Sequence, residues 1–388
     1  MELYTLDSQL RRAAVIDRFE SMIWTERFSA WGDFELHIFS TPEMRRLLPA
    51  GVRLSMSDSY RVMTTELIEN TSDSEGRAML KVTGRSLEAL MDERVARNTF
   101  ANLTTTPKWV LTGTPGDIAR QIFNEIMRTN VNFADDQLPF LVAGSLFPPG
   151  TIEEPDEVIT VEFGLVSVYK AVQEICNAYD LGFRIVRNFD NSELYFDIYA
   201  GNDRTTLQNT LAPVVFAPNL DNLTNISEVT STANYRNVAY VYHPLATQVV
   251  TADGVSVEVE GFERRVLPVD ASDIDLPAGT ELNNALQQRG RDELAKNRPV
   301  QAFDGELPNN SPYRYEIAYQ LGDKVEMRND DGVTNQMRVT EQIFVSDAQG
   351  ERSYPTLAID RFITPGSWFA WDYNQTWANA DGHWGDLP

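Results

Sequence analysis

Short runs of alternating side chains, separated by turn signals, constrain the fold of this chain more than any other feature. The stretch SMIWTERFSAWGDFELHIF (residues 21–39) contains two such runs around a Gly-Asp pair. Apolar side chains share one face of these runs: Met22, Trp24, Phe28, Phe34, Leu36 and Ile38. Glu26 interrupts that face. Period-two alternation around a Gly-Asp turn is typical of a β-hairpin with one buried face.

Further turn signals divide other strand-like runs along the chain. They are SDSEG (72–76), NFDNS (188–192), TADGV (251–255), NDDGV (329–333) and SDAQGE (346–351). Asp-Gly and Asn-rich reversals between alternating runs are strong local hairpin signals. The run ATQVV before residue 251 is therefore expected to pair with the run SVEVEGF after residue 255. Several hairpins of this kind favour barrels or sandwiches.

Helix signals are fewer and cluster between residues 105 and 182. Thr114 and Pro115 are a typical N-cap and first helical residue, and an apolar stripe follows them. Other helices are expected over 86–95, with Ser86 as its cap, over 168–182, and over 280–297. The Pro- and Gly-rich stretch 136–159 is expected to be an extended surface loop.

The distribution of these signals predicts a mainly β fold with an α/β insertion. The expected domains are a first β-barrel over 1–100, the insertion over 101–205, and a second β-barrel over 206–365. A tryptophan-rich C-terminal extension then covers 366–388. A chain of 388 residues is long enough for several such domains.

The formal charge of −24 makes specific nucleic-acid binding unfavourable, because an acidic surface repels phosphates. Two interpretations remain open: the charge keeps the protein soluble, or it forms a surface past which nucleic acid slides. The one cysteine, Cys176, lies on an apolar helix stripe and is expected to be a buried, inert thiol. We expect no signal peptide and no membrane span.

No catalytic or metal-binding motif is present in the sequence. The three histidines, His37, His243 and His383, do not have metal-ligand spacing. The run GRSLE (84–88) has Glu88 where a nucleophile elbow needs glycine. With 57 acidic residues, any two carboxylates could be nominated as a glycosidase pair. We therefore expect no enzyme activity, no cofactor and no metal.

The C-terminal segment contains four of the seven tryptophans: Trp368, Trp371, Trp377 and Trp384. Such aromatic residues can stack on sugars of a receptor, or they can pack onto a neighbouring subunit. The second interpretation is preferred, because exposed apolar area commonly marks an interface. Packing within the same chain is left open.

An ordered series of motifs resembles the minor tail, or tail-hub, family of long-tailed phages that infect actinobacteria. The series comprises Ile16-Asp17, Trp24-Thr25, Arg27-Phe28, Gly32-Asp33-Phe34-Glu35-Leu36, VTGRSLEALMDERV (82–95), AGNDRT (200–205), NYRNVAYVY (234–242), YQLGDKVEMR (319–328) and LAID (357–360). The resemblance covers about residues 1–362 in order.

This resemblance implies a hub of β-barrel domains that forms a homotrimeric ring at the distal end of the phage tail. It implies contacts with the distal tail protein ring, the tape measure protein, and downstream tail tip or fibre proteins. Phage DNA would pass through the ring without specific binding. The alternatives left open are a cell-wall hydrolase of the tail tip and a receptor-binding module.

The motif residues are expected to have structural roles. They are Trp24, Arg27, Gly32, Asp33, Phe34, Glu35, Leu36, Gly84, Arg85 and Ser86. Trp24 and Phe34 should pack in the first barrel, Gly32 should allow the turn, and Gly84 should let a strand give way to a helix. Either Asp33 or Glu35 is expected to pair with Arg27 or Arg85.

Overall fold

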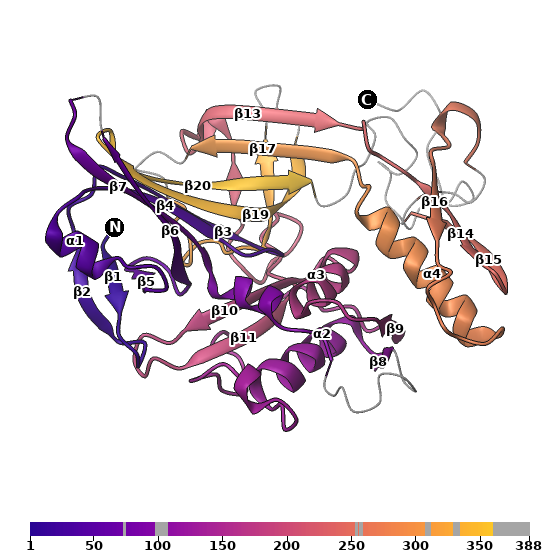
Figure 1. Cartoon of the computed structure of the whole chain (residues 1–388). Coiled ribbons are helices and arrows are strands. Elements are labelled where there is room, and N and C mark those ends of the chain that lie inside the picture. The colour runs from indigo at the N-terminus through magenta and orange to yellow at the C-terminus, as the bar shows by residue number, and fades with distance from the viewer. Residues whose placement is uncertain are drawn as a thin grey trace.

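The protein is described by a computed structural model that covers residues 1–72, 75–97, 108–252, 255, 259–306, 312–328 and 334–359. His383 and the four C-terminal tryptophans, Trp368, Trp371, Trp377 and Trp384, lie outside these residues. Figure 1 shows a large curved sheet, a group of helices beneath it, and a smaller unit at one end.

The N-terminal part forms seven strands and one short helix. They are β1 (Leu3–Leu6), β2 (Arg12–Ile16), β3 (Ser21–Arg27), β4 (Asp33–Phe39), α1 (Pro42–Leu47), β5 (Arg53–Met56), β6 (Val62–Ser72) and β7 (Ala78–Ser86). β3 and β4 pair in antiparallel register, with Trp24 opposite Phe34, so the predicted hairpin is confirmed. Glu26 is buried together with the apolar side chains of its face.

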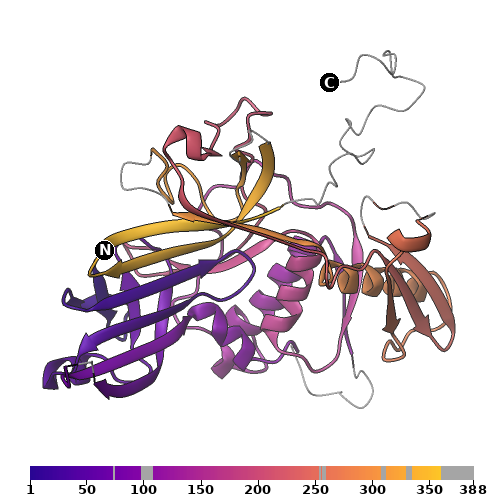
Figure 2. The ribbon, with the colours of Figure 1, turned by 90° about the horizontal axis from the view of Figure 1, so that it is seen from above.

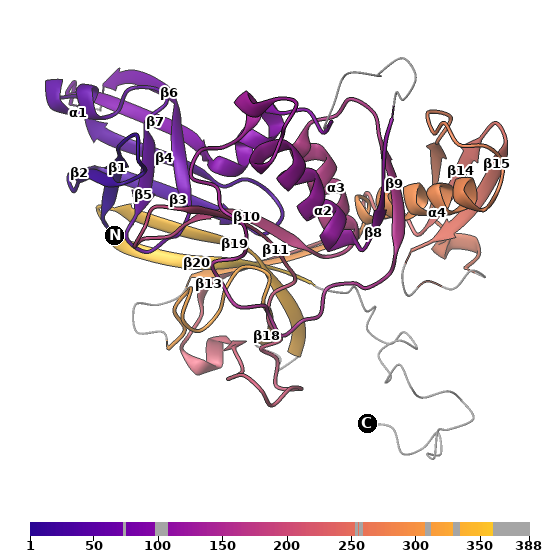
Figure 3. The same ribbon diagram turned by 90° about the horizontal axis from the view of Figure 1, so that it is seen from below.

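The middle of the chain contains most of the helices. Its elements are η1 (Leu87–Glu93), β8 (Trp109–Gly113), α2 (Pro115–Phe123), η2 (Asn124–Arg128), η3 (Ala134–Asp136), β9 (Ile159–Phe163), α3 (Val168–Ala178), β10 (Gly182–Arg187) and β11 (Leu194–Tyr199). Thr114 caps α2 as predicted: its hydroxyl accepts a hydrogen bond from the Asp117 backbone N–H at 3.3 Å. Figure 3 shows α2 and α3 side by side.

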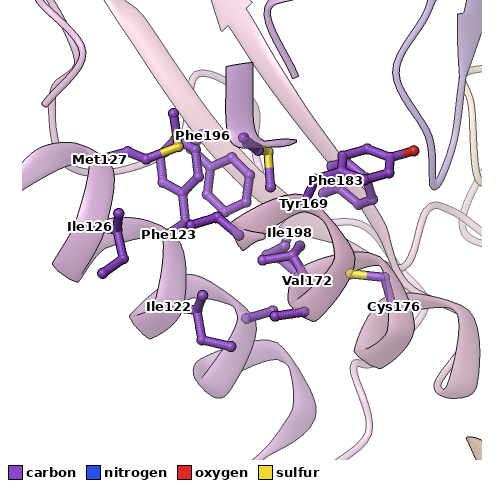
Figure 4. Packing of buried hydrophobic residues seen from close by; sticks show 14 of the residues in the cluster. Ile122, Phe123, Ile126, Met127, Tyr169, Val172, Cys176, Phe183, Phe196 and Ile198 are labelled. Atoms are coloured by element: carbon purple, nitrogen blue, oxygen red, sulfur yellow. The ribbon is translucent and has the colours of Figure 1, made fainter. Parts of the chain in front are cut away.

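The helices α2 and α3 pack on the hairpin β10–β11 through one large apolar core (Figure 4). Phe123 of α2 stacks on Phe196 of β11 with ring centroids 3.6 Å apart. Cys176 of α3 is fully buried in this core, as predicted, and burial raises the pKa of its thiol.

The last third of the chain supplies the remaining elements. They are β12 (Val215–Phe216), η4 (Pro218–Leu220), β13 (Thr224–Ser231), β14 (Val238–His243), β15 (Ala246–Thr251), η5 (Gly261–Glu263), β16 (Val266–Asp270), α4 (Thr280–Ala295), β17 (Val300–Glu306), β18 (Lys324–Arg328), β19 (Thr334–Asp347) and β20 (Gly350–Ile359). The run expected to pair with β15 lies partly outside the described residues, since it includes residues 256–258. β15 pairs with β14, and Gly261–Glu263 forms a turn.

Strands from both ends of the chain belong to one sheet. Its order is β13-β17-β20-β19-β3-β4-β7-β6-β5-β1-β2, and β18 pairs with β19 and with β12. The link between the two halves is the antiparallel pairing of β3 with β19, where Trp24 lies opposite Phe344. The mainly β fold is therefore confirmed. The two barrels, the ring and the domain boundaries stay predictions.

A separate small unit lies at one end of the molecule (Figure 2). We call residues 232–299 the end module: it contains the three-stranded sheet β15-β14-β16 and the helix α4, which share their own apolar core. The chain enters and leaves the end module through the paired strands β13 and β17, with Ser231 opposite Val300.

Replacing the largest fully buried side chain tests this description of the core. Trp24 has no exposed surface and lies against Phe34, with ring centroids 6.1 Å apart. We expect Trp24→Ala to lower the free energy of unfolding by about 3–5 kcal/mol, because it leaves a large cavity. Phe262→Ala is the control, since Phe262 is fully exposed and should change stability by less than about 0.5 kcal/mol. Similar losses for both variants in denaturant titrations would contradict the burial of Trp24.

Candidate functional site: a junction of three chain segments

The predicted motif residues of the N-terminal sheet form one structural cluster. Arg27 donates to Asp33 at 2.5 Å and to Glu341 of β19 at 2.6 Å, so one of the expected ion pairs is present. Arg85 instead pairs with Glu66 at 2.9 Å. Glu35 bonds to Lys81 at 2.9 Å and to His37 at 2.7 Å, and these bonds lower the pKa of the Glu35 carboxyl. Leu36 is fully buried.

Three motif residues have roles that differ from those predicted. Ser86 occupies the N-cap position of η1, but its hydroxyl accepts from the Gly32 N–H at 2.8 Å and not from the helix. Gly84 lies within β7, where an added Cβ would overlap the Thr64 carbonyl. Gly32 likewise lacks room for a Cβ because the Thr25 carbonyl is next to it. These glycines permit close backbone approach rather than a special turn.

Phe28, just after β3, is where three distant segments meet. Its backbone N–H donates to the Thr340 carbonyl at 2.9 Å, and its carbonyl accepts from the Phe183 N–H at 3.0 Å. Its buried ring lies edge-on to Tyr199, with centroids 5.3 Å apart. The N-terminal sheet, the hairpin β10–β11 and the C-terminal strands are therefore joined at this position, which we call the junction.

Two glycines make room for the Phe28 ring. An added Cβ at Gly182 or at Gly322 would overlap ring carbons of Phe28. Gly322 also has a φ of +86°, a conformation that favours glycine. The Arg338 guanidinium lies 5.3 Å from the ring centroid and donates to the carbonyls of Ala200 and Gly322 at 2.8 and 2.9 Å.

A buried carboxylate joins two of the motifs that carried the family resemblance. Asp323, from YQLGDKVEMR, is fully buried. Its Oδ1 accepts from the Asn202 backbone N–H and side-chain amide at 2.8 and 2.9 Å, and its Oδ2 pairs with Arg204 at 3.1 Å. Asn202 and Arg204 belong to AGNDRT. Burial raises the pKa of Asp323, and the bonds from Asn202 oppose that shift.

A second buried polar network lies beside the junction. Glu88 of η1 forms an ion pair with Arg61 and accepts from the Ile185 N–H at 2.7 Å. Arg61 also donates to the Arg27 carbonyl at 3.3 Å. Arg184 of β10 pairs with Asp197 of β11 at 3.1 Å, and both side chains are buried.

Glu26 links this network to the C-terminal part of the chain. Its carboxylate accepts from Trp24 Nε1 at 3.2 Å, from the Ser59 hydroxyl, and from the Tyr315 hydroxyl at 3.0 Å. Burial, followed by the nearby Glu26 carboxylate, raises the pKa of Glu316 to about 7. Burying a charged carboxylate such as that of Glu26 destabilises the folded state unless the carboxylate has hydrogen-bond partners. The network therefore favours the one arrangement of the segments that supplies these partners.

The loop 136–159 is extended as predicted, but it is fastened to the junction region. The Ile152 N–H donates to the Gly201 carbonyl at 3.2 Å, and the Thr151 N–H donates to Asn202 Oδ1 at 3.2 Å. Glu154 forms an ion pair with Arg120 of α2.

The end module contacts the rest of the molecule through polar groups on α4 and in the residues that flank it. Tyr179 donates to Gln288 at 2.6 Å, Arg298 pairs with Asp180 at 2.7 Å, and Arg291 pairs with Glu157 at 2.8 Å. The apolar core of the end module contains no residue from outside it among the buried residues described. Its docking therefore depends on hydrogen bonds and ion pairs.

The described histidines have plain structural roles. His37 bonds to Glu35, and buried His243 donates from Nε2 to the Ile274 carbonyl at 3.0 Å while Nδ1 accepts from the Leu245 N–H at 3.1 Å. No group of three or more His, Cys, Asp or Glu side chains that could hold a metal ion occurs in the described part of the chain. Nor does any helix in that part have the length and apolarity to cross a membrane.

The three buried carboxylates around the junction, Glu26, Glu88 and Asp323, were not predicted as site residues from the sequence. A signal existed for two of them: Glu26 interrupts an apolar strand face, and Glu88 stands beside the buried face of η1. Asp323 lies in a motif that carried the family resemblance, but only the fold brings it to Asn202.

The fold is shared with solved phage tail proteins. A tail protein from Neisseria meningitidis MC58 has a TM-score of 0.55 at 14% identity, over 92% of this chain and 96% of that chain. The 43 kDa tail protein of prophage MuSo2 from Shewanella oneidensis has a TM-score of 0.55 at 10% identity, over 92% and 97%. Prophage tail protein gp18 from Listeria monocytogenes EGD-e has a TM-score of 0.51 at 12% identity, over 95% and 98%.

The sequence identifies the family more closely. Residues 1–357 match the family described as Siphovirus ReqiPepy6 Gp37-like protein. The chain therefore belongs to this siphovirus tail protein family, and the resemblance predicted from the motif series is confirmed. No curated protein matches the sequence.

A glycine substitution at the junction tests its packing. We expect Gly182→Ala to destabilise the protein by about 1–3 kcal/mol, because the added methyl group overlaps the Phe28 ring. Gly164→Ala is the matched control, since an added Cβ there meets no atom within 4 Å. Combining Gly182→Ala with Phe28→Leu should give a non-additive free energy of unfolding, which a double-mutant cycle measures. Additive effects would contradict direct contact.

Asp292 of α4 predicts a pH dependence of stability. Burial raises the pKa of this carboxyl from 3.8 to about 7; the Glu174 carboxylate adds to the shift, whereas the Gln288 amide and Lys296 oppose it. The folded state therefore binds an extra proton between these values, so this group's contribution to stability falls as pH rises from about 4 to 7. Asp292→Asn should remove this part of the pH dependence of the melting temperature between about pH 4 and 7. The exposed Glu281→Gln variant is the control. If the melting temperature of Asp292→Asn depends on pH as strongly as that of the control, the role of Asp292 is contradicted.

Proposed function

We propose that this chain is the structural hub at the distal end of a long, non-contractile phage tail. In this proposal it assembles as a homotrimer, lies beneath the distal tail protein ring, and contacts the end of the tape measure protein. It carries the tail tip or fibre proteins below. The family match over residues 1–357, together with the tail protein fold, is the observation that carries the proposal.

The open order of the large sheet supports a ring. Its path ends at β2 on one side and at β13 on the other, and neither strand has a second partner among the described residues. Unpaired strand edges favour pairing with another chain, and proteins commonly remove them by cyclic assembly. A ring of identical copies would cover such edges and would complete the barrels predicted from the sequence.

The junction supports a mechanical role. Phe28, the Asp323 network and the Glu26 network connect three segments through buried contacts. A hub that links the tail tube to tip proteins must transmit force without local unfolding. Buried hydrogen-bonded networks such as those of Asp323 and Glu26 favour a single arrangement of the core, which suits this requirement.

The acidic composition supports passage of DNA. A formal charge of −24 repels phosphates, so few contacts would retard the moving duplex. We also propose that the chain is not an enzyme. Its family and its structural neighbours are tail proteins, and the ionisable groups at the junction bond to one another.

Cryo-electron microscopy of the virion tail tests the proposal. We expect three copies of the chain around the tail axis at its distal end, directly below the distal tail protein ring. A location in the capsid, or a different number of copies at the tip, would contradict the hub assignment. Zymography of the purified chain on host peptidoglycan is the companion measurement. Clearing that disappears on substitution of particular carboxylates would contradict the non-enzymatic role.

A further inference from the structure

The sheet of the end module has one covered face and one uncovered face. Ala239 and Val241 of β14 are buried in the core that this sheet shares with α4. Tyr240 and Tyr242 alternate with them and remain 46% and 54% exposed. Since α4 also contacts α3 and β9, the uncovered face points away from the main body.

The uncovered face combines apolar and aromatic side chains with polar ones: Thr247 of β15 and Asp270 of β16 lie on either side of Tyr242 and are exposed. Tyr240 lies opposite Val249 of β15 and Pro268 of β16, and Val249 is 63% exposed. The Arg264 guanidinium donates to the Tyr240 hydroxyl at 3.1 Å and holds that ring in place. We call Tyr240, Tyr242, Val249 and Pro268 the open face. These four side chains form a contiguous exposed patch with two aromatic rings, which is unusual on a solvated sheet face and suits docking of an apolar segment.

The described chain ends at the base of the end module. β20 ends at Ile359, one residue past Ala358, which lies opposite Ala302 of β17. Two residues before Ala302, Val300 lies opposite Ser231 of β13. The strand register therefore places the start of residues 360–388 beside the two points where the chain enters and leaves the end module.

The C-terminal segment is long enough to reach the open face. Tyr240 is within about 30 Å of Ser231 along the chain, and crossing from β20 to β13 adds two strand spacings, or about 10 Å. Residues 360–388 can span up to about 95 Å when extended. Trp371 and the residues after it can therefore reach the open face without any change in the described fold.

We propose that the tryptophan-rich C-terminal segment docks on the open face of its own chain, with Trp371, Trp377 and Trp384 against Tyr240, Tyr242 and Val249. Indole rings bury a large apolar area and pack well on aromatic side chains. The short tether gives the segment a high effective concentration at this surface, which favours its own chain over a second copy. The sequence alone had favoured a neighbouring subunit; the position of Ile359 favours the same chain.

A fluorescent label that tryptophan quenches on contact tests this proposal, which does not depend on the hub assignment. Val249→Cys places the label on the open face of the full chain. The native Cys176 is fully buried, and burial raises the pKa of its thiol, so it should not react. A bimane label at position 249 should be quenched, and replacing the four C-terminal tryptophans by phenylalanine should abolish the quenching. Val131, in the insertion, is 90% exposed. The fluorescence of a bimane label at Val131→Cys should not change when the four tryptophans are replaced.

Dilution and mixing separate the possible occupants. Quenching that does not change with protein concentration supports docking within one chain. Quenching that vanishes on dilution, and returns when an unlabelled full-length chain is added, would overturn the proposal in favour of a neighbouring copy. An unquenched label at position 249 in the free chain would also overturn the proposal. The open face would then be expected to bind a different tail protein.

Discussion

The packing of Phe28 is the constraint on which the rest of the structure depends. Its ring takes the space that the glycines at 182 and 322 leave empty, and its backbone bonds to two other segments. These segments are more than 150 residues apart along the chain. Such a junction forms only when all three segments are in place, which makes the main body cooperative but dependent on non-local contacts.

Buried charges add specificity to that packing. The Asp323 carboxylate gains its bonds from Asn202 and Arg204 only when the insertion approaches, in addition to the local bond from the Gln320 N–H. Glu88 needs both Arg61 and the β10 backbone. A misplaced segment would leave a carboxylate buried without a partner, which is far more costly than an unfilled apolar contact. The polar networks thus exclude alternative registers of the sheet, while the apolar cores supply most of the stability.

Local features of the fold could be predicted from the sequence. The hairpin β3–β4, the Thr114 cap and the apolar stripes of α2 and α3 depend on neighbouring residues, so periodicity and capping rules identify them. The pairing of β3 with β19, the hydrogen bond between Ser86 and Gly32, and the junction depend on residues far apart in the sequence. Secondary-structure propensity depends on neighbouring residues and therefore cannot predict such contacts. The pairing of β14 with β15 was not predicted, because the turn between these strands contains no glycine signal.

The path of the chain through the end module has an evolutionary consequence. Ser231 and Val300, its two attachment points, lie opposite each other in the ribbon β13–β17. The unit between them has a separate apolar core, and polar groups on and around α4 contact the main body. The end module could therefore be exchanged or deleted by recombination. In a chain without it, a short turn would be enough to connect β13 to β17. Diversification of a phage lineage could then act on this unit without disturbing the junction.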